Sequence, residues 1–228
     1  MIGLVCDGGA HDARFFCVDV RREGALRRLT ARRAAAALAR AGVRAAVFPR
    51  EYPDADLFAR RGIAPVPVRP LRSETAAEIV LAALDTLGIP AGEAKVLFAA
   101  ERVNGEMCDT VLAVSERVRY IALDAANGGE ALACRLRQTR GAAVCGAEGA
   151  VLRVAFDETA AASEGTLPLY DPALRVFYTL AGEPAEEQML AALRRMEAVP
   201  RSQIAVTGVS LSGLKSRALQ NSIPSSSR

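Results

Sequence analysis

The sequence predicts an α/β protein whose largely parallel sheet is flanked by helices. Short apolar segments rich in β-branched residues alternate with longer segments of helical periodicity, most regularly between residues 95 and 145. Strands that alternate with helices usually lie parallel in one sheet, because each crossover returns the chain to the same end of the sheet. The composition of the 228 residues, 51% hydrophobic and 24% charged, is that of a globular protein. The pattern changes after residue 145, where we expect an antiparallel appendage.

The sequence predicts that residues 1–90 form an N-terminal α/β half. The expected elements are strands at 2–6 and 15–20, a helix at 31–41, a strand at 43–48, a helix at 54–61, an edge strand at 64–68 and a helix at 73–87. Thr30 and Ser73 are suited to cap the starts of two helices, and Gly42 is suited to end the first. Pro65 and Pro67 have no N–H to donate, so their strand is expected at a sheet edge.

The sequence predicts that residues 91–209 form a second half. Gly88 and Pro90 end the preceding helix, and the stretch 89–92 is the expected boundary. The expected elements are strands at 95–99, 119–123 and 142–145 with helices at 105–118 and 128–139, then antiparallel strands at 151–156, 167–170 and 175–180, a helix at 184–198 and a strand at 203–209. Residues 210–228 are polar and serine-rich, which favours a disordered tail.

Several classes of protein are disfavoured by the sequence. No basic stretch precedes an apolar core at the N-terminus, and no apolar run approaches the ~20 residues that span a bilayer. Neither a secretory signal nor a membrane partner is therefore expected. The five cysteines include no CxxC pair, and their odd number does not fit a disulfide framework. We expect free thiols in the reducing cytoplasm.

The segment at 95–145 resembles half of a Rossmann-type dinucleotide-binding domain. Asp124 follows the second strand about 20 residues beyond the first turn, where such domains place an acid against the adenosine ribose. The resemblance implies NAD(P) as cofactor and an oxidoreductase activity. The first turn, however, reads AAERVNG from residue 99 and lacks the glycines that admit a pyrophosphate. Glu101 also places negative charge where the diphosphate would lie.

Ligands of open α/β sheets bind beyond the carboxyl ends of the strands. The predicted ligand rim consists of the residues at these ends: Asp7, Gly8, Gly9, Glu101, Arg102, Asn104, Asp124, Asn127 and Gly128. The glycines belong to the rim because consecutive glycines after a strand expose backbone amides to an anion, although turn formation is the alternative interpretation. The chain has one histidine, His11, and we expect no metal site.

A locally basic segment suggests a different function. Residues 21–50 contain nine arginines and one acidic residue, Glu23. Alanine and leucine, rather than aromatic or polar side chains, separate these arginines, so a solvated helix face is favoured over a nucleic-acid surface.

Three functional hypotheses follow from these patterns. We favour a protein that binds a small molecule or nucleotide without the dinucleotide fingerprint, and we assign it neither a catalytic activity nor a cofactor. One alternative is an NAD(P)-linked oxidoreductase with an unusual phosphate turn. The other is an interaction module that uses the arginine-rich face.

Overall fold

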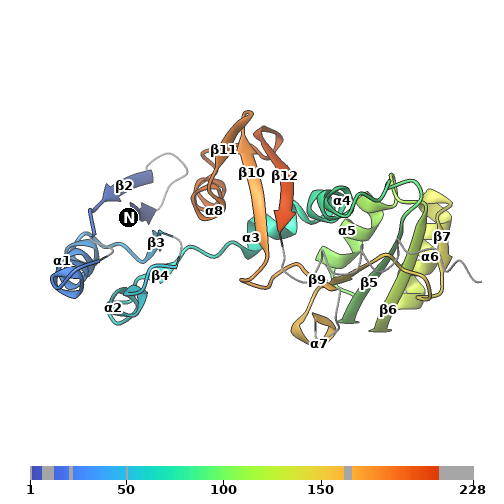
Figure 1. Ribbon diagram of the computed structural model, residues 1–228, viewed down its shortest axis with the longest axis horizontal. Helices are drawn as coiled ribbons and strands as arrows, with labels where there is room; N and C mark the ends of the chain where they lie inside the picture. Colours follow the sequence, from blue (N-terminus) through green and yellow to red (C-terminus); the bar gives the residue numbers. More distant parts are fainter. Residues whose placement is uncertain (1, 7–12, 21–22, 50, 162–165, 211–228) are drawn as a thin grey trace, which may run out of the picture. The chain divides into compact units, whose positions relative to one another are not determined.

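A computed structural model describes residues 2–6, 13–20, 23–49, 51–161 and 166–210, with backbone only for 2–6, 13–15 and 161. It confirms the α/β class (Figure 1). The chain forms two compact units, and each unit consists of two segments. Unit 1 comprises Met1–Leu71 and Ala185–Ile204, and unit 2 comprises Arg72–Pro184 and Ala205–Arg228. The domain boundary near residue 90 stays a prediction, and the predicted tail lies outside the described residues beyond Ser210.

Unit 1 contains a four-stranded sheet in the order β2-β1-β3-β4. Its strands are β1 (Ile2–Cys6), β2 (Ala13–Cys17), β3 (Ala45–Val47) and β4 (Ala64–Pro65). The first two strands, which the sequence predicts at 2–6 and 15–20, pair antiparallel, with Ile2 opposite Cys17. The third strand is antiparallel to β1, and β4 is parallel to β3 at the sheet edge. The prolines therefore predict the position of β4 correctly.

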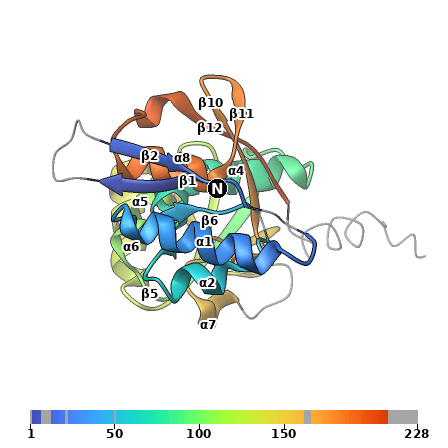
Figure 2. The ribbon, with the colours of Figure 1, turned by 90° about the vertical axis from the view of Figure 1, so that its left-hand side faces the viewer.

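Three helices belong to unit 1: α1 (Arg27–Arg40), α2 (Ala55–Ala59) and α8 (Glu187–Arg195). Figure 2 shows α1 and α2 beside each other, and the two helices are in contact. The first helix begins before the expected Ala31, and Thr30 lies inside it, donating its hydroxyl to the carbonyl of Arg27 at 2.7 Å. The expected cap is wrong because arginine and leucine are good helix formers and extend the helix toward its N-terminus. Pro184 lies in a strand rather than in α8.

Gln188 links α8 to the strands of unit 1. Its side-chain oxygen accepts the N–H of Phe48 at 2.6 Å, and its side-chain nitrogen donates to the carbonyl of Val66 at 3.4 Å. Phe48 and Val66 follow directly after β3 and β4, where backbone groups leave the sheet ladder. A buried backbone group without a hydrogen bond is costly, so one glutamine amide stabilises the ends of both strands.

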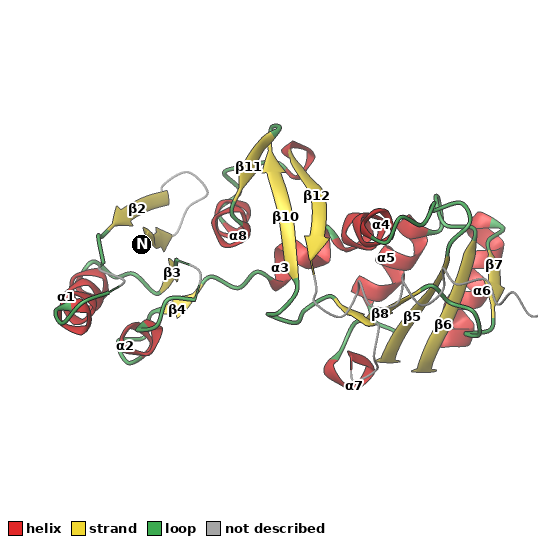
Figure 3. Ribbon diagram, in the orientation of Figure 1, coloured by secondary structure: helices red, strands yellow, loops and turns green. Residues whose placement is uncertain are grey.

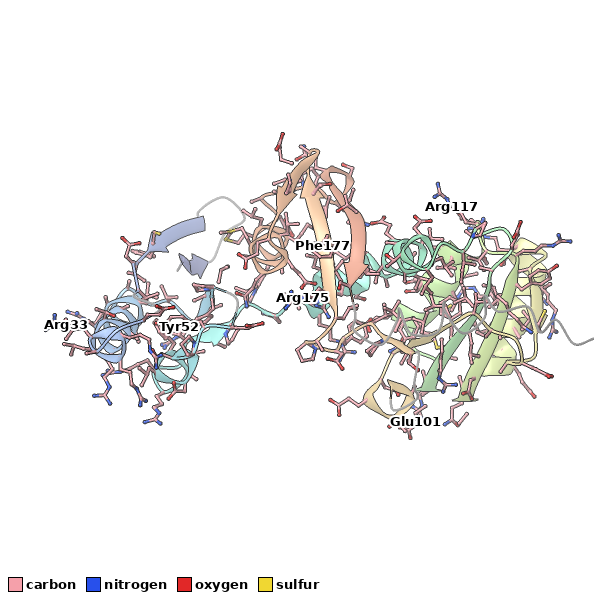
Figure 4. All side chains as sticks on the ribbon, in the orientation of Figure 1. Arg33, Tyr52, Glu101, Arg117, Arg175 and Phe177 are labelled. Atoms are coloured by element: carbon pink, nitrogen blue, oxygen red, sulfur yellow. The ribbon has the colours of Figure 1, made fainter. Side chains whose placement is uncertain are left out.

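Three buried aromatic rings form the centre of the unit 1 core. Phe48, Tyr52 and Phe58 lie with ring centroids 5.2–6.1 Å apart, and Phe58 is fully buried. The Tyr52 hydroxyl is buried and has no hydrogen-bond partner among the described residues (Figure 4). Burial raises the pKa of Tyr52, the Asp54 carboxylate raises it further, and Arg27 opposes the increase.

We expect Tyr52→Phe to raise the free energy of unfolding by about 1 kcal/mol at neutral pH, because a buried hydroxyl without a partner is removed. Since the folded-state pKa lies above the unfolded value, the wild-type protein loses stability as the pH rises above about 10, and the variant lacks this loss. Urea unfolding at pH 7 and pH 10.5 measures both effects. A destabilised variant at pH 7 would contradict the prediction.

Unit 2 contains a five-stranded parallel sheet in the order β7-β6-β5-β8-β9. Its strands are β5 (Lys95–Arg102), β6 (Tyr120–Asn127), β7 (Ala143–Cys145), β8 (Leu152–Ala155) and β9 (Thr166–Pro168). The expectation that the chain becomes antiparallel directly after residue 145 is wrong for β8 and β9. The connection at 146–151 is short, yet it returns the chain to the start of β5, where the Val151 N–H donates to the Lys95 carbonyl at 2.9 Å.

The helices of this region are α3 (Arg69–Glu74), α4 (Ala76–Thr86), α5 (Gly105–Val114), α6 (Gly129–Arg140) and α7 (Glu158–Ala161). The single helix expected at 73–87 is therefore divided, and Ser73 lies within α3 instead of capping a helix. Thr75 stands between α3 and α4, and its buried hydroxyl lies 3.2 Å from that of Tyr178. This tertiary hydrogen bond accompanies the break in the helix.

The predicted antiparallel appendage is confirmed as a three-stranded sheet in the order β11-β10-β12 (Figure 3). Its strands are β10 (Arg175–Leu180), β11 (Glu183–Ala185) and β12 (Ile204–Ser210). Within the part of the chain that the structure describes, every helix is too short or too polar to cross a bilayer.

Candidate functional site

The strand order of the parallel sheet creates one position where the chain changes direction across the sheet. Numbered along the chain from β5, the order is 3-2-1-4-5. The strands proceed to one side of β5 and then return to β8 on its other side, so the segments that follow β5 and β8 diverge. We call the carboxyl ends of these two strands, residues 101–106 and 157–158, the switch-point edge.

Asp157 is the central polar residue of the switch-point edge. Its two carboxylate oxygens accept backbone N–H groups from both sides of the switch point, from Glu101 at 2.7 Å and from Ala160 at 2.8 Å. The first bond continues the β5–β8 pairing beyond the last strand residue, Ala155. The Asp157 carboxylate thus already accepts the two backbone N–H groups at this edge. Its negative charge disfavours the binding of an anion beside it.

We expect Asp157→Ala to lower the free energy of unfolding by about 1–2 kcal/mol, because two backbone amides lose their acceptor and α7 loses a cap. The neighbouring exposed Glu158 supplies a matched control: Glu158→Ala should change the stability by no more than about 0.5 kcal/mol. Chemical denaturation of both variants measures the difference, and equal stabilities would contradict the assigned role of Asp157.

A second polar contact crosses the carboxyl end of β8. The Tyr170 hydroxyl donates to the Glu106 carboxylate at 3.0 Å. Glu106 lies in the first turn of α5, which follows β5, and Tyr170 lies two residues beyond β9. Since β8 lies between β5 and β9, this bond joins the segments that follow the two strands flanking β8.

Two of the predicted rim residues have structural roles. The Asn104 side chain accepts the Met107 N–H at 2.8 Å and caps α5. Gly128 adopts a left-handed φ of +84° before α6, and a Cβ atom there would lie 3.2 Å from the Val103 Cβ. Both the backbone conformation and the close approach require glycine. The turn interpretation therefore accounts for Gly128 without a bound anion.

Asp124 does not lie at the end of its strand, so that expectation is wrong. The strand β6 continues through Asn127, and Asp124 pairs with Ala99 in the middle of the sheet. Its carboxylate forms an ion pair with Arg153 of β8 at 2.9 Å, across β5. Parallel pairing continues beyond Asp124 as far as Asn127, which pairs with Arg102. The residue at the end of β6 is therefore the amide residue Asn127.

Glu101, Arg102 and Asn127 are exposed at the carboxyl ends of β5 and β6. Figure 4 labels Glu101 at this edge. The Val103 N–H donates to the Asn127 carbonyl at 2.9 Å, which holds the two strand ends together. The structure thus brings together Glu101, Arg102, Asn104, Asn127 and Gly128, and adds Asp157, Glu106 and Tyr170, which the predicted rim lacks.

The remaining predicted residues, Asp7, Gly8 and Gly9, lie outside the described residues, as does His11. They follow β1 and belong to unit 1, whereas the switch-point edge belongs to unit 2. Across residues 13–20, 23–49, 51–161 and 166–210, no group of three or more histidine, cysteine, aspartate or glutamate side chains is arranged to hold a metal ion.

Fold and site together define a Rossmann-like α/β protein with an acidic switch-point edge. Comparison of the chain with protein-family models, with curated proteins and with solved structures gave no match.

Proposed function

We propose that unit 2 binds a small molecule at the switch-point edge. The observation that supports this proposal most directly is the reversal of strand order between β5 and β8, since ligands of open α/β sheets bind at such points. Exposed polar side chains at this edge, Glu101 and Arg102 among them, are available to orient a ligand. No catalytic role is assigned to them.

The chemistry of the edge favours an uncharged or cationic ligand, or a nucleotide without a diphosphate. Asp157 already accepts the two amides that an anion would need, and Glu101 and Glu158 add exposed negative charge. A diphosphate would meet these carboxylates at short range. We further propose a reducing compartment such as the cytoplasm, because the four cysteines with described side chains are free thiols.

Backbone amide NMR tests the proposed site. Adenosine and spermidine serve as uncharged and cationic probes, and ADP and NADH as diphosphate probes. We expect adenosine or spermidine to shift the resonances of residues 101–106 and 157–160, and neither diphosphate to do so. Shifts confined to the amino ends of the strands, near Lys95 and residues 148–151, would contradict the proposal, as would no shift from any probe.

Glu101→Gln separates the charge argument from the location of the site. Glutamine keeps the shape of this exposed side chain and removes its negative charge, so ADP binding should strengthen if the carboxylates of the edge exclude the diphosphate. The oxidoreductase alternative instead predicts that NADH stabilises the wild-type protein against heat.

The exposed face of α1 favours a second function, interaction with an anionic partner. Leu26, Leu29, Arg33, Ala37 and Arg40 follow one another at intervals of three or four residues and form a stripe along the helix, which we call the α1 stripe. Leu26 and Leu29 are 53% and 43% exposed. Among the described residues, neither Arg33 nor Arg40 forms an ion pair.

We expect the double variant Arg33→Glu/Arg40→Glu to elute from a heparin column at distinctly lower salt than the wild-type protein, because carboxylates replace two guanidinium groups that form no ion pair with any described residue. Arg117→Glu is the matched control, since Arg117 is an exposed arginine of unit 2. Absent or salt-independent retention of the wild-type protein would eliminate this function.

A further inference from the structure

Unit 2 contains a groove between α4 and β12, with a volume of about 420 Å³. It is separate from the switch-point edge. We call it the β12 groove; its lining residues are Glu78, Leu81, Ala82, Asp85, Thr86, Arg117, Val206, Thr207 and Gly208. All of these lining residues belong to unit 2.

The β12 groove is bordered by the backbone edge of β12. Three consecutive strand residues, Val206, Thr207 and Gly208, line it. Side chains alternate between the two faces of a strand, so consecutive residues line one groove only when the edge of the strand faces it. β12 is the last strand of the sheet order β11-β10-β12 among the described residues, which leaves this edge without a neighbouring strand. Such an edge is a template for a further strand.

Different side chains flank this edge on the two faces of the sheet. On one face, Tyr178 of β10 lies 3.2 Å from Thr75 at the start of α4, which places the helix on that side. On the other face, a Cβ atom at Gly208 would lie 3.7 Å from the Phe177 ring, and Phe177 is 51% exposed (Figure 4). Because Gly208 has no side chain, the exposed Phe177 ring lies beside the β12 backbone on this face of the sheet.

The helix side of the β12 groove is predominantly acidic. Glu78 and Asp85 are seven residues apart on α4, which places them on the same helix face about 10 Å apart. Arg117 is the one basic residue among the lining residues. An added strand would therefore meet carboxylates on one face and an exposed aromatic ring on the other.

We propose that the β12 groove binds an extended peptide segment of another protein, which adds to β12 as a fourth strand. Alternate residues of this segment are basic and apolar: the basic side chains face Glu78 and Asp85, and the apolar side chains face Phe177 across Gly208. Main-chain hydrogen bonds to the edge supply the affinity, and the alternation supplies the specificity.

Fluorescence anisotropy with the full chain tests the proposal. The probe is a fluorescein-labelled decapeptide of alternating lysine and valine, and the controls are alternating glutamate and valine and a block peptide of five lysines followed by five valines. We expect the alternating lysine peptide to bind at least about tenfold more tightly than either control. Equal binding of the block peptide would reduce the interaction to charge alone and overturn the proposal.

N-methylation of the peptide tests the strand addition itself. An added strand donates every second N–H to its neighbour, so methylating the lysine amides and methylating the valine amides should have unequal effects. One of the two peptides should lose about tenfold or more in affinity, while the other retains its affinity. Equal effects would show that the backbone edge is not used.

Protein variants test the two faces. Asp85→Lys should weaken binding about three- to tenfold, and Phe177→Ser should weaken it by a similar factor. Glu93→Lys, which reverses an exposed charge outside the groove, is the matched control and should bind normally. If size-exclusion chromatography instead shows a dimer that excludes the peptide, the occupant is a second copy of the chain and the proposal is wrong.

Discussion

Arg72→Met should lower the free energy of unfolding by about 3–5 kcal/mol, because it removes the donor for three backbone carbonyl groups and leaves them without this hydrogen bond inside the protein. Arg72 is 3% exposed. Its guanidinium donates to Leu169 at 3.2 Å, Asp171 at 2.7 Å and Leu174 at 2.8 Å. One side chain of α3 thus fixes the segment that connects β9 to β10.

Urea denaturation followed by circular dichroism measures the effect. Arg72→Lys is the informative control, because an ammonium group keeps the charge but lacks the planar arrangement of donors that reaches three carbonyls; we expect an intermediate loss. Arg117→Met removes an exposed arginine of the same unit and should cost no more than about 0.5 kcal/mol. A loss below about 1 kcal/mol for Arg72→Met would show that water or relaxed backbone replaces the guanidinium.

Local chemistry in the sequence predicts several elements correctly. The edge position of β4 depends on prolines that cannot donate a backbone N–H to a neighbouring strand. The alternation of strands and helices between residues 95 and 145 predicts the parallel pairing of β5, β6 and β7. In these cases, the residues that determine the structure are close together in the chain.

The direction of β8 depends instead on a tertiary arrangement. A six-residue connection, 146–151, is typical of an antiparallel turn, and nothing in its composition indicates that it crosses to the start of β5. The main-chain bond between Val151 and Lys95 fixes the parallel pairing, and these residues are 56 positions apart. Strand direction could therefore not be predicted from local pattern alone.

The wrong strand direction expected for residues 151–156 also explains why the predicted site lacks Asp157. If the strand at 151–156 were antiparallel to β5, Asp157 would lie at the opposite edge of the sheet from the carboxyl end of β5. In the parallel sheet, it stands at the carboxyl edge and bonds the Glu101 N–H. The available signal was an aspartate directly after an apolar strand, which becomes informative once that strand is placed parallel to β5.

Asp124 illustrates a second reason for failure. The sequence places an acid about 20 residues beyond the first turn, as in dinucleotide-binding domains. Its carboxylate forms an ion pair with Arg153, a residue of β8 that the sequence does not associate with it. A carboxylate can therefore match a motif by spacing and yet form an ion pair with a residue distant in the chain.

Phe98→Ala should destabilise the protein by about 3–5 kcal/mol, since it leaves a large cavity in the middle of the parallel sheet. Phe98 is fully buried on the central strand β5, lies in register with Leu123 and Val154, and contacts the Phe156 ring at a centroid distance of 6.4 Å. Phe98→Leu should cost about 1–1.5 kcal/mol. Phe177→Ala, the same change at a 51% exposed ring of the same unit, should cost about 0.5 kcal/mol or less. If chemical denaturation gave equal losses at Phe98 and Phe177, β5 would not be the centre of the folded core.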